Sequence, residues 1–339
     1  MSGLPLTQLA TPPTPGLPAA PDGRTIGYLR ISLTRGCAMR CLYCRPAVDR
    51  NPHAEQRLTP AQLEALARHL VGRHGVKKIR LTGGDPTSRP DLLQIIERLA
   101  AIPGLDDLAM TTNGLTLARQ AHRYREAGLK RVNVSLDTLD RRRFAHMTGV
   151  DGLAQVLAGL DAAHAAGLTD IKLNTVVVRG QNLDDLPSLL KFAADRALTL
   201  RLIELMPMGP LAADWQGRYV DERAMRRRLA ETVRRYELLD QGRSAARPYR
   251  VTLRDGRRLT LGFITPMSCN FCHACDRLRI GADGAIFPCL MDQPRGTVAP
   301  AFVGGFDSKL CDTLLARAYR HKADVHPETG PTVMTHIGG

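Results

Sequence analysis

Cys37-Ala-Met-Arg-Cys41-Leu-Tyr-Cys44 is the stretch around which this 339-residue chain is organised. The C-x3-C-x2-C spacing lets three thiolates face one metal centre from a single loop. A closed structural zinc site or an ordinary four-cysteine iron–sulfur cluster needs four protein ligands, so three ligands leave one coordination position open. An open position indicates a metal that takes part in chemistry. The alternative is three unrelated buried cysteines, which rarely crowd one loop.

A second cysteine group, Cys272-x2-Cys275-x13-Cys289, again offers three ligands. Asp283-Gly284 predicts a two-residue hairpin turn before the last of these cysteines. Such a turn would place Cys289 opposite Leu278 on the returning strand, close to Cys275. We therefore expect a second metal centre that also has one open position.

Two cysteines stand outside these groups. Cys269 lies three residues before Cys272, so a closed four-cysteine zinc or iron–sulfur site is an alternative for the second group. Cys311 stands alone in an expected helix and is predicted to be a buried apolar thiol. Eight cysteines gathered in this way are typical of metal ligands in a reducing compartment, which predicts a cytoplasmic protein.

The composition predicts a globular protein with an anionic ligand. Lys and Arg number 47 against 33 Asp and Glu, and a net charge of +14 attracts nucleic acid, anionic lipid or a polyphosphorylated small molecule. Aromatic residues are only 4%, which argues against base stacking on a nucleic acid. The sequence shows neither an apolar run of about eighteen residues nor a secretory signal. We expect neither nucleic acid nor a membrane as partner.

Strand and helix patterns alternate between residues 25 and 205. Short apolar runs predict six strands, at Ile26–Leu33, Lys78–Leu81, Leu108–Thr112, Arg131–Leu136, Ile171–Val178 and Leu200–Leu205. Amphipathic stretches predict helices near Pro60–Gly72, Pro90–Ala101, Leu115–Ala127, Gly152–Ala166 and Leu183–Ala197. This alternation predicts an α/β fold with right-handed βαβ units and a parallel sheet.

Six units are fewer than the eight that close a TIM barrel, so an incomplete (β/α)6 TIM-like barrel and an open doubly wound sheet are both candidates. Residues that could contact a ligand end or follow the expected strands, where both folds place their sites; they are Cys37–Cys44, Gly83-Gly84, Asn113-Gly114, Ser135 and Met206. Their gathering at one edge favours the barrel-like arc.

The chain divides into three expected parts. Residues 1–23 are rich in proline and poor in charge, which predicts a flexible leader. Residues 24–235 form the barrel. The alternation of strands and helices stops in residues 236–339, where Asp255-Gly256 predicts a hairpin. We expect these residues to form a smaller α+β domain that carries the second metal centre. The chain ends in Gly338-Gly339, which has no side chains to prevent it from entering a narrow site.

Two further patterns indicate a binding site. Gly83-Gly84-Asp85 follows the second strand, where paired glycines let the backbone approach a ligand and the carboxylate can accept from an ammonium group. A tight βα turn is the alternative. Cationic residues recur on the expected inner face: Arg30, Arg80, Lys172, Arg201, Arg277 and Arg279. Each alone is an ordinary strand charge, but together they predict a triphosphate or carboxylate-rich substrate.

The combined motifs resemble a known family. Cys37-x3-Cys41-x2-Cys44, with Tyr43 before the last cysteine, is similar to the signature of the radical S-adenosylmethionine (SAM) superfamily. Further matches are Lys78-Ile-Arg-Leu-Thr-Gly-Gly84, Thr111-Thr-Asn-Gly114, Asn133-Val-Ser-Leu-Asp137, Lys172–Gly180, Arg201–Pro207, Cys272-x2-Cys275-x-Arg-Leu-Arg279 with Cys289, and the terminal diglycine. From Arg24 to Gly339 the chain resembles the GTP 3′,8-cyclases (MoaA) of molybdenum cofactor biosynthesis.

The resemblance implies a role for each group of residues. Cys37, Cys41 and Cys44 would hold a [4Fe–4S] cluster that binds SAM, and Cys272, Cys275 and Cys289 a second [4Fe–4S] cluster that binds the guanine of GTP, with Cys269 as a bystander. SAM contacts would come from Tyr43, Gly83, Gly84, Asp85, Ser135 and Met206, although Asp85 replaces a glutamate of the family pattern. GTP contacts would come from Arg30, Arg80, Thr111, Lys172, Arg201, Arg277, Leu278 and Arg279. Arg277, Arg279, Gly338 and Gly339 would also be catalytic.

The implied activity is that of a lyase that converts GTP to (8S)-3′,8-cyclo-7,8-dihydroguanosine 5′-triphosphate. Reductive cleavage of SAM would give a 5′-deoxyadenosyl radical, which takes the 3′ hydrogen of GTP before C3′ attacks C8 of guanine. The implied partners are a one-electron donor such as flavodoxin or ferredoxin, a downstream cyclic pyranopterin monophosphate synthase and a second copy in a homodimer. Two alternatives are a peptide-modifying radical SAM enzyme with two clusters and a zinc-binding nucleic-acid module.

Overall fold

The computed structural model of the chain describes residues 23–44, 57–325, 327–328, 330 and 334. Residues 1–22 of the expected leader and the tail residues Gly338 and Gly339 lie outside this part of the chain. Within it, eleven strands form one sheet in the order β11-β10-β1-β2-β3-β4-β5-β6-β9-β8-β7. None of the described helices is long and apolar enough to cross a membrane.

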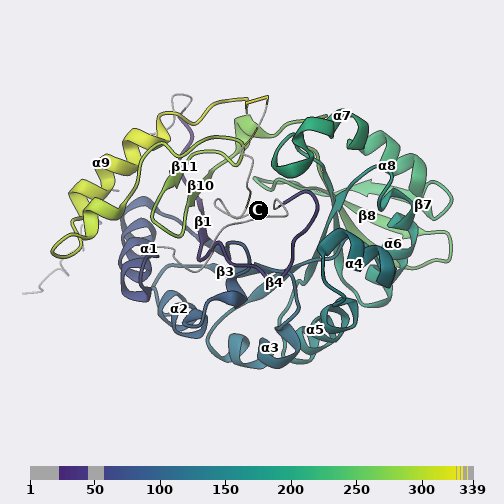
Figure 1. Ribbon diagram of the computed structural model, residues 1–339, viewed down its shortest axis with the longest axis horizontal. Coiled ribbons are helices and arrows are strands. Elements are labelled where there is room, and N and C mark those ends of the chain that lie inside the picture. The colour runs from purple at the N-terminus through teal and green to yellow at the C-terminus, as the bar shows by residue number, and fades with distance from the viewer. Residues whose placement is uncertain (1–22, 45–56, 326, 329, 331–333, 335–339) are drawn as a thin grey trace, which may run out of the picture.

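The first six strands are parallel and follow one another in chain order. They are β1 (Tyr28–Ser32), β2 (Lys78–Thr82), β3 (Asp107–Thr112), β4 (Arg131–Ser135), β5 (Lys172–Val177) and β6 (Thr199–Glu204). The connecting helices cover the outside of the arc (Figure 1); they are α1 (Pro60–His74), α2 (Leu92–Ala100), α3 (Leu117–Glu126), α4 (Arg141–Thr148), α5 (Leu153–Ala165) and α6 (Leu186–Asp195). The incomplete (β/α)6 barrel is thereby confirmed.

Local sequence explains where these helices start and which face they bury. Thr59 caps α1 by accepting from the Gln62 amide, and the Gln62 side chain accepts in turn from the Thr59 amide. Leu63, Leu66 and Leu70 recur at helical spacing and are fully buried against the sheet side of the core. The hydrophobic core of the molecule therefore lies between the sheet and its outer layer of helices, and leaves the inside of the arc for polar side chains.

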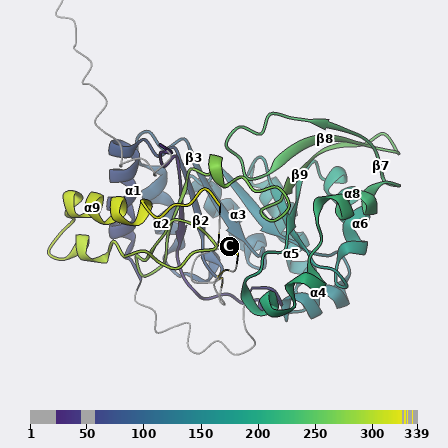
Figure 2. The ribbon, with the colours of Figure 1, turned by 90° about the horizontal axis from the view of Figure 1, so that it is seen from above.

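The segment after β6 adds strands to both edges of the same sheet. Its helices and strands are α7 (Trp215–Arg218), α8 (Glu222–Leu229), β7 (Val233–Leu238), β8 (Arg247–Leu253), β9 (Arg258–Ile264), β10 (Arg277–Ile280), β11 (Ile286–Phe287) and α9 (Ser308–Tyr319). The β8–β9 hairpin around Asp255-Gly256 is confirmed. β9 pairs in parallel with β6 and β10 in parallel with β1, so residues after 235 lengthen the arc at both ends (Figure 1). Figure 2 shows β7, β8 and β9 together at one end of the molecule. The expected boundary at 235/236 falls inside β7, and this division stays a prediction.

The second hairpin differs from the sequence-based prediction by one residue. β10 and β11 pair Arg279 with Phe287 and Ile280 with Ile286. The Gly281 amide donates to the Ala285 carbonyl, so the loop holds three residues, 282–284, instead of two. Gly284 takes the left-handed conformation, with φ of 86°, that a three-residue loop places at its last position. The expectation that Cys289 lies opposite Leu278 was therefore wrong.

A polar cluster fastens α9 to α1. The Nε2 atoms of His69 and His74 lie 2.6 and 2.7 Å from the same Asp312 carboxylate oxygen, and Arg73 Nε lies 2.9 Å from the other oxygen. These are hydrogen-bond distances. They are shorter than the roughly 3.3 Å between two ligands of a tetrahedral zinc ion with bonds of about 2.0 Å. The cluster therefore acts as a hydrogen-bonded clasp between two helices that are more than two hundred residues apart in the chain.

Asp312→Ala should lower the free energy of unfolding by about 1–3 kcal/mol, because the buried His74 loses its acceptor. Burial also lowers the pKa of His74, so its imidazole is neutral in the folded protein. This contribution to stability is lost as the pH falls below the unfolded-state value of about 6.5. Denaturant titrations at pH 7.5 and 5.5 measure both effects. Asp151→Ala, which removes an exposed partner of Arg141, is the control; an equal loss in both variants would contradict the clasp.

Candidate active site

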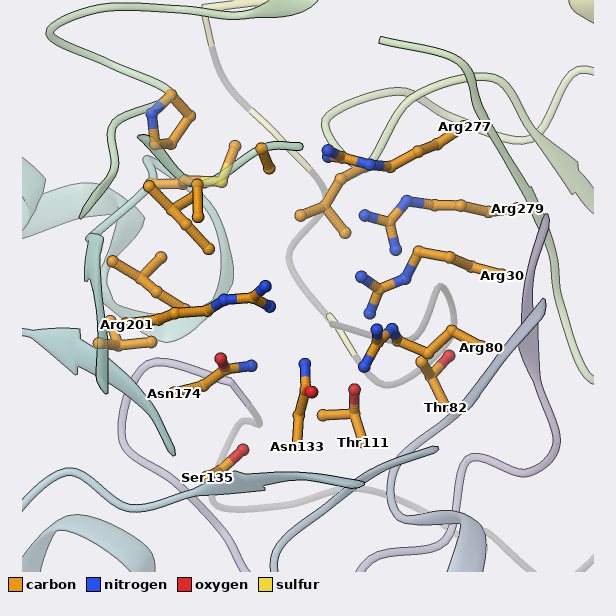
Figure 3. A pocket seen from close by; sticks show the side chains of 18 of the residues that line it. Arg30, Arg80, Thr82, Thr111, Asn133, Ser135, Asn174, Arg201, Arg277 and Arg279 are labelled. Carbon is orange, nitrogen blue, oxygen red and sulfur yellow. The ribbon is translucent and has the colours of Figure 1, made fainter. Parts of the chain in front are cut away.

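One cavity of about 820 Å³ lies inside the arc of strands. It brings together every described residue that the sequence predicted for the site except Leu278, including Cys37, Cys41 and Cys44 (the first triplet) and Cys272, Cys275 and Cys289 (the second triplet). Figure 3 shows Arg201 on one side of the cavity, facing Arg30, Arg80, Arg277 and Arg279 on the other. The cavity therefore joins two sets of thiols and a group of guanidinium groups in a single space.

Alternation along the strands selects which residues line the cavity. β1 contributes Tyr28 and Arg30, and β10 contributes Arg277 and Arg279. Successive side chains of a strand point to opposite faces of the sheet. Leu278 accordingly lies fully buried in the hydrophobic core behind the cavity wall. A contact between Leu278 and GTP would therefore use the backbone of this residue, and stays a prediction.

The loop of the first triplet is held by backbone and side-chain contacts. The Arg40 and Leu42 amides donate to the carbonyls of Thr148 and Met147, at the end of α4, over 2.7 and 3.0 Å. Asn113 Nδ2 lies 3.6 Å from the sulfur of Cys37. A donor that faces the sulfur favours a thiolate, which is the form that binds metal. These contacts hold the loop of the first triplet against the end of α4 and against Asn113, which follows β3.

The donor sets fit iron–sulfur clusters better than a closed zinc site. Each triplet offers three cysteine sulfurs to the same cavity. Thiolates are the usual protein ligands of iron–sulfur clusters, whereas a closed structural zinc site needs four protein ligands. Three thiolates with one open position therefore disfavour the zinc-binding alternative.

Cys269 does not share the cavity with the second triplet. It is exposed, it is absent from the cavity lining, and its sulfur lies 3.8 Å from Arg247 Nη1. The Met291 amide, in contrast, lies 3.4 Å from the sulfur of Cys289, inside the cavity wall. These positions favour a three-cysteine site with Cys269 as a bystander over the closed four-cysteine site.

The paired glycines pack against the chain that leads into the first triplet. The Gly84 amide donates to the Thr34 carbonyl over 2.7 Å. A Cβ atom on Gly84 would lie 2.4 Å from the carbonyl oxygens of both Arg35 and Gly36, which is closer than van der Waals contact allows. Gly83 has a φ of 148°, in the region that favours glycine. Neither position accommodates a side chain, which explains why the sequence has two glycines here.

The Asp85 carboxylate accepts hydrogen bonds from other groups of the protein. It accepts from the Thr87 amide at 2.9 Å, from Thr112 Oγ1 at 3.0 Å and from the Asn113 amide. Burial raises its pKa, while these hydrogen bonds act in the opposite direction. Asp85 thus ties the glycine loop to the end of β3, beside the Asn113 that faces Cys37. Its contact with the SAM ammonium group stays a prediction.

Tyr43, Ser135 and Met206 line the same cavity as the first triplet. The Tyr43 hydroxyl donates to Asp137 over 2.7 Å, and the Val176 amide donates to the other carboxylate oxygen over 2.9 Å. Burial raises the pKa of Asp137 to about 6. The sequence singled out Tyr43 but not Asp137, which fixes its orientation from the end of β4.

The cations of the cavity raise one another's electrostatic energy. Burial lowers the pKa of Lys172 to about 7, with further lowering by Arg201 and Arg131. Burial likewise lowers the pKa of Arg201 to about 9 and that of Arg279 to about 10. Burial is the largest cause of each shift, and repulsion by neighbouring cations adds to it, although Lys172 pairs with Asp170 and Arg131 with Asp107. A polyanion in the cavity would relieve this repulsion.

Tyr28 lines the cavity although no sequence motif indicated it. The Arg80 and Arg277 guanidinium carbons lie 5.9 and 5.8 Å from the centre of its ring, and Arg80 Nε donates to its hydroxyl. Burial alone would raise its pKa, but the positive charges of Arg80, Arg30 and Arg277 lower it to about 7. Strand alternation would have indicated Tyr28, because it lies two residues before Arg30 and its side chain therefore points to the same face of the sheet. The same rule leads to other lining residues that were missed: Lys78, Thr82, Arg131, Asn133 and Asn174.

Two family models cover most of the described chain. The Radical SAM superfamily matches residues 31–193, and Molybdenum Cofactor Synthesis C matches residues 198–328. The crystal structure of Streptococcus suis SuiB bound to precursor peptide SuiA has a similar fold, with a TM-score of 0.59 over 88% of this chain and 67% of that chain. Sequence identity to SuiB is 14%, so this likeness concerns the fold alone.

Two similar proteins in sequence are GTP 3′,8-cyclases of bacteria. The chain is 44% identical over 270 residues to GTP 3′,8-cyclase 1 of Pseudomonas aeruginosa, covering 79% of this chain and 81% of that protein. It is 40% identical over 324 residues to GTP 3′,8-cyclase of Moorella thermoacetica, covering 93% and 98%. The two cysteine triplets and the cations of the same cavity are therefore found in a chain that is similar to these enzymes over most of its length. The chain belongs to the GTP 3′,8-cyclase family of the radical SAM superfamily.

Proposed function

We propose that this protein is a GTP 3′,8-cyclase, which converts GTP to (8S)-3′,8-cyclo-7,8-dihydroguanosine 5′-triphosphate at the start of molybdenum cofactor biosynthesis. The observation that carries the proposal is the single cavity that contains both cysteine triplets and the cations of β1, β2, β5, β6 and β10. A peptide substrate would not call for this concentration of positive charge. Membership of the cyclase family supports the same substrate.

The first triplet would hold a [4Fe–4S] cluster, beside which Tyr43 and the Gly83-Gly84 loop form the SAM site. The second triplet would hold a second [4Fe–4S] cluster at the guanine end of the substrate. When bound, the first cluster and SAM supply the 5′-deoxyadenosyl radical that removes the hydrogen at C3′ of GTP. The protein itself supplies position, charge and exclusion of water.

The cavity cations hold the triphosphate while the ribose reacts. Arg30 is paired in register with Arg80 of β2 and with Arg279 of β10, so three guanidinium groups form one layer across neighbouring strands. Guanidinium groups bind phosphate through paired hydrogen bonds in a fixed plane. Arg201 faces this layer from the opposite wall (Figure 3). A triphosphate held from both sides cannot rotate, which keeps C3′ and C8 in place for ring closure.

Family membership supports further proposals about the reaction class, the location and the partners of the protein. We place the reaction among the lyases and the protein in the cytoplasm. The electron donor would be flavodoxin or ferredoxin, and a cyclic pyranopterin monophosphate synthase would consume the product. We also propose a homodimer and a separate C-terminal domain from residue 236. Gly338 and Gly339 would have a catalytic role.

A product assay tests the function. Reconstituted, reduced protein given SAM and GTP should form 5′-deoxyadenosine and a cyclised nucleotide in equal amounts, as measured by chromatography and mass spectrometry. ATP in place of GTP should give no cyclised product. Formation of 5′-deoxyadenosine without consumption of GTP would contradict the proposal.

GTP affinity should fall as the pH rises above 7. Lys172 and Tyr28 both have a pKa of about 7 in the free protein, and a triphosphate beside them raises both values. Each group then takes up a proton on binding, so the dissociation constant should rise between pH 7 and pH 8 by roughly fivefold for one group and thirtyfold for both. Equilibrium dialysis at constant ionic strength measures this, and Tyr28→Phe should flatten the dependence. A dissociation constant independent of pH would contradict it.

A further inference from the structure

Glu204 is a buried carboxylate that the motifs of the sequence do not explain. It ends β6, its residue is 1% exposed, and it borders the cavity two residues before Met206. A buried carboxylate is costly unless its oxygens receive hydrogen bonds. The donors that surround Glu204 therefore indicate what it holds in place.

Those donors come from three separate elements. One oxygen accepts from the Met267 and Ser268 amides, each over 3.0 Å. The other oxygen accepts from the Ser268 hydroxyl and, over 3.3 Å, from the Glu222 amide in the first turn of α8. Tyr219, at the end of α7, is the third partner. Burial raises its pKa, and the charge of Glu204 and the hydrogen bond between the two side chains raise this pKa further. Backbone amides and hydroxyl groups thus donate hydrogen bonds to the single carboxylate of Glu204 at the end of β6.

The turn that Glu204 holds leads directly to the second triplet. Residues 265–269 form a closed turn, because the Cys269 amide donates to the Thr265 carbonyl and Thr265 Oγ1 donates to the Cys269 carbonyl, both over 3.1 Å. Cys272 follows three residues later. β9 ends directly before this turn and lies beside β6 in the sheet, where Ile264 pairs with Ile203. Glu204 therefore bends the chain after β9 back over the cavity.

We propose that Glu204 is a positioning residue that fixes the loop carrying Cys272 and Cys275 relative to the SAM end of β6. Met206 of the SAM site follows two residues after Glu204. The Glu204 carboxylate therefore sets the distance between the SAM site and the second triplet, where the guanine of GTP would bind. This inference rests on the proposed function and adds a determinant of where GTP lies. Glu204 does not touch the reacting atoms.

Glu204→Gln tests the proposal, because the neutral amide removes the negative charge that strengthens the bonds from the Met267 and Ser268 N–H groups, and its NH2 group faces the Glu222 N–H. We expect the Met267 and Ser268 amides to exchange hydrogen at least tenfold faster, as measured by mass spectrometry on the cluster-loaded protein. GTP affinity should fall at least tenfold. SAM cleavage without GTP should stay within about twofold of wild type, so the ratio of 5′-deoxyadenosine to cyclised product should rise.

Glu222→Gln is the matched control. The Glu222 carboxylate pairs with Arg226 and Arg247, and its replacement leaves the backbone amide that contacts Glu204. We expect unchanged exchange at Met267 and Ser268 in this variant. Ser268→Ala removes only the hydroxyl donor; should Glu204→Gln fail to fold, it is expected to show the same changes at a smaller size.

Unchanged exchange or unchanged GTP affinity in a folded Glu204→Gln protein would overturn the proposal. A loss of SAM cleavage equal to the loss of product would also overturn it, since that result indicates general damage. Wild-type protein that makes no cyclised GTP would contradict the proposed function instead. The exchange measurement is independent of GTP chemistry, which keeps the two outcomes apart.

Discussion

Arg277→Ala is expected to weaken GTP binding about 10- to 100-fold while both cysteine triplets still assemble their clusters. The Arg277 guanidinium carbon lies 5.8 Å from the centre of the Tyr28 ring and 5.1 Å from that of Phe271, so aromatic faces hold it at the cavity wall. A charge-assisted hydrogen bond to phosphate contributes about 1.5–3 kcal/mol, and each 1.4 kcal/mol is tenfold in affinity. Equilibrium dialysis with GTP and iron analysis measure the two parts of this prediction.

Arg257→Ala is the control for this change. Arg257 also belongs to the C-terminal part of the chain, but it pairs with Asp195 and Asp255 at the surface and does not line the cavity. Its replacement removes the same net charge without changing the site. Equal GTP affinity in wild-type and Arg277→Ala proteins would exclude Arg277 from the triphosphate site.

Gly84→Ala is expected to abolish SAM cleavage, with a loss of at least a hundredfold, and to leave GTP binding within about threefold. The added methyl group would lie 2.4 Å from two backbone oxygens that directly precede Cys37. Backbone atoms cannot rotate away as a side chain can, so the loop of the first triplet must shift. SAM affinity by equilibrium dialysis and 5′-deoxyadenosine formation measure this effect.

Gly72→Ala provides the matched substitution. Gly72 lies exposed within α1, where a Cβ atom would meet nothing within 4 Å, and alanine is the better helix former. We expect full SAM cleavage and slightly higher stability in this variant. Normal SAM cleavage by the Gly84→Ala protein would show that the close approach at Gly84 does not shape the SAM site.

The barrel was predictable because its signals are local. Each of the six apolar runs became a strand, with ends shifted by at most two residues, as in Ile26–Leu33 against Tyr28–Ser32. Parallel βαβ units then follow from general rules of handedness and connection. The partners of β9 and β10 were not predictable, because strand pairing across the whole chain leaves no local pattern. The one-residue error at Cys289 has a similar origin, since turn length depends on how Gly284 packs.

The sequence predicted those residues of the candidate site that belong to recognisable motifs. The thiols, the paired glycines and most of the arginines were found, and the cavity brings them together. Tyr28, Asp137 and Glu204 were missed because their roles depend on contacts with distant segments. Asp85 shows the same limit: its sequence position suggested a ligand for SAM, whereas Thr87, Thr112 and Asn113 donate to its carboxylate.

Transfer of a labelled hydrogen tests the central claim most directly. GTP deuterated at C3′ is given to the reduced, reconstituted protein with SAM, and the mass of the 5′-deoxyadenosine is measured. The arrangement of both triplets around one cation-lined cavity predicts one deuterium in each 5′-deoxyadenosine molecule, together with an equal amount of cyclised nucleotide. Unlabelled 5′-deoxyadenosine formed while GTP remains unchanged would contradict it.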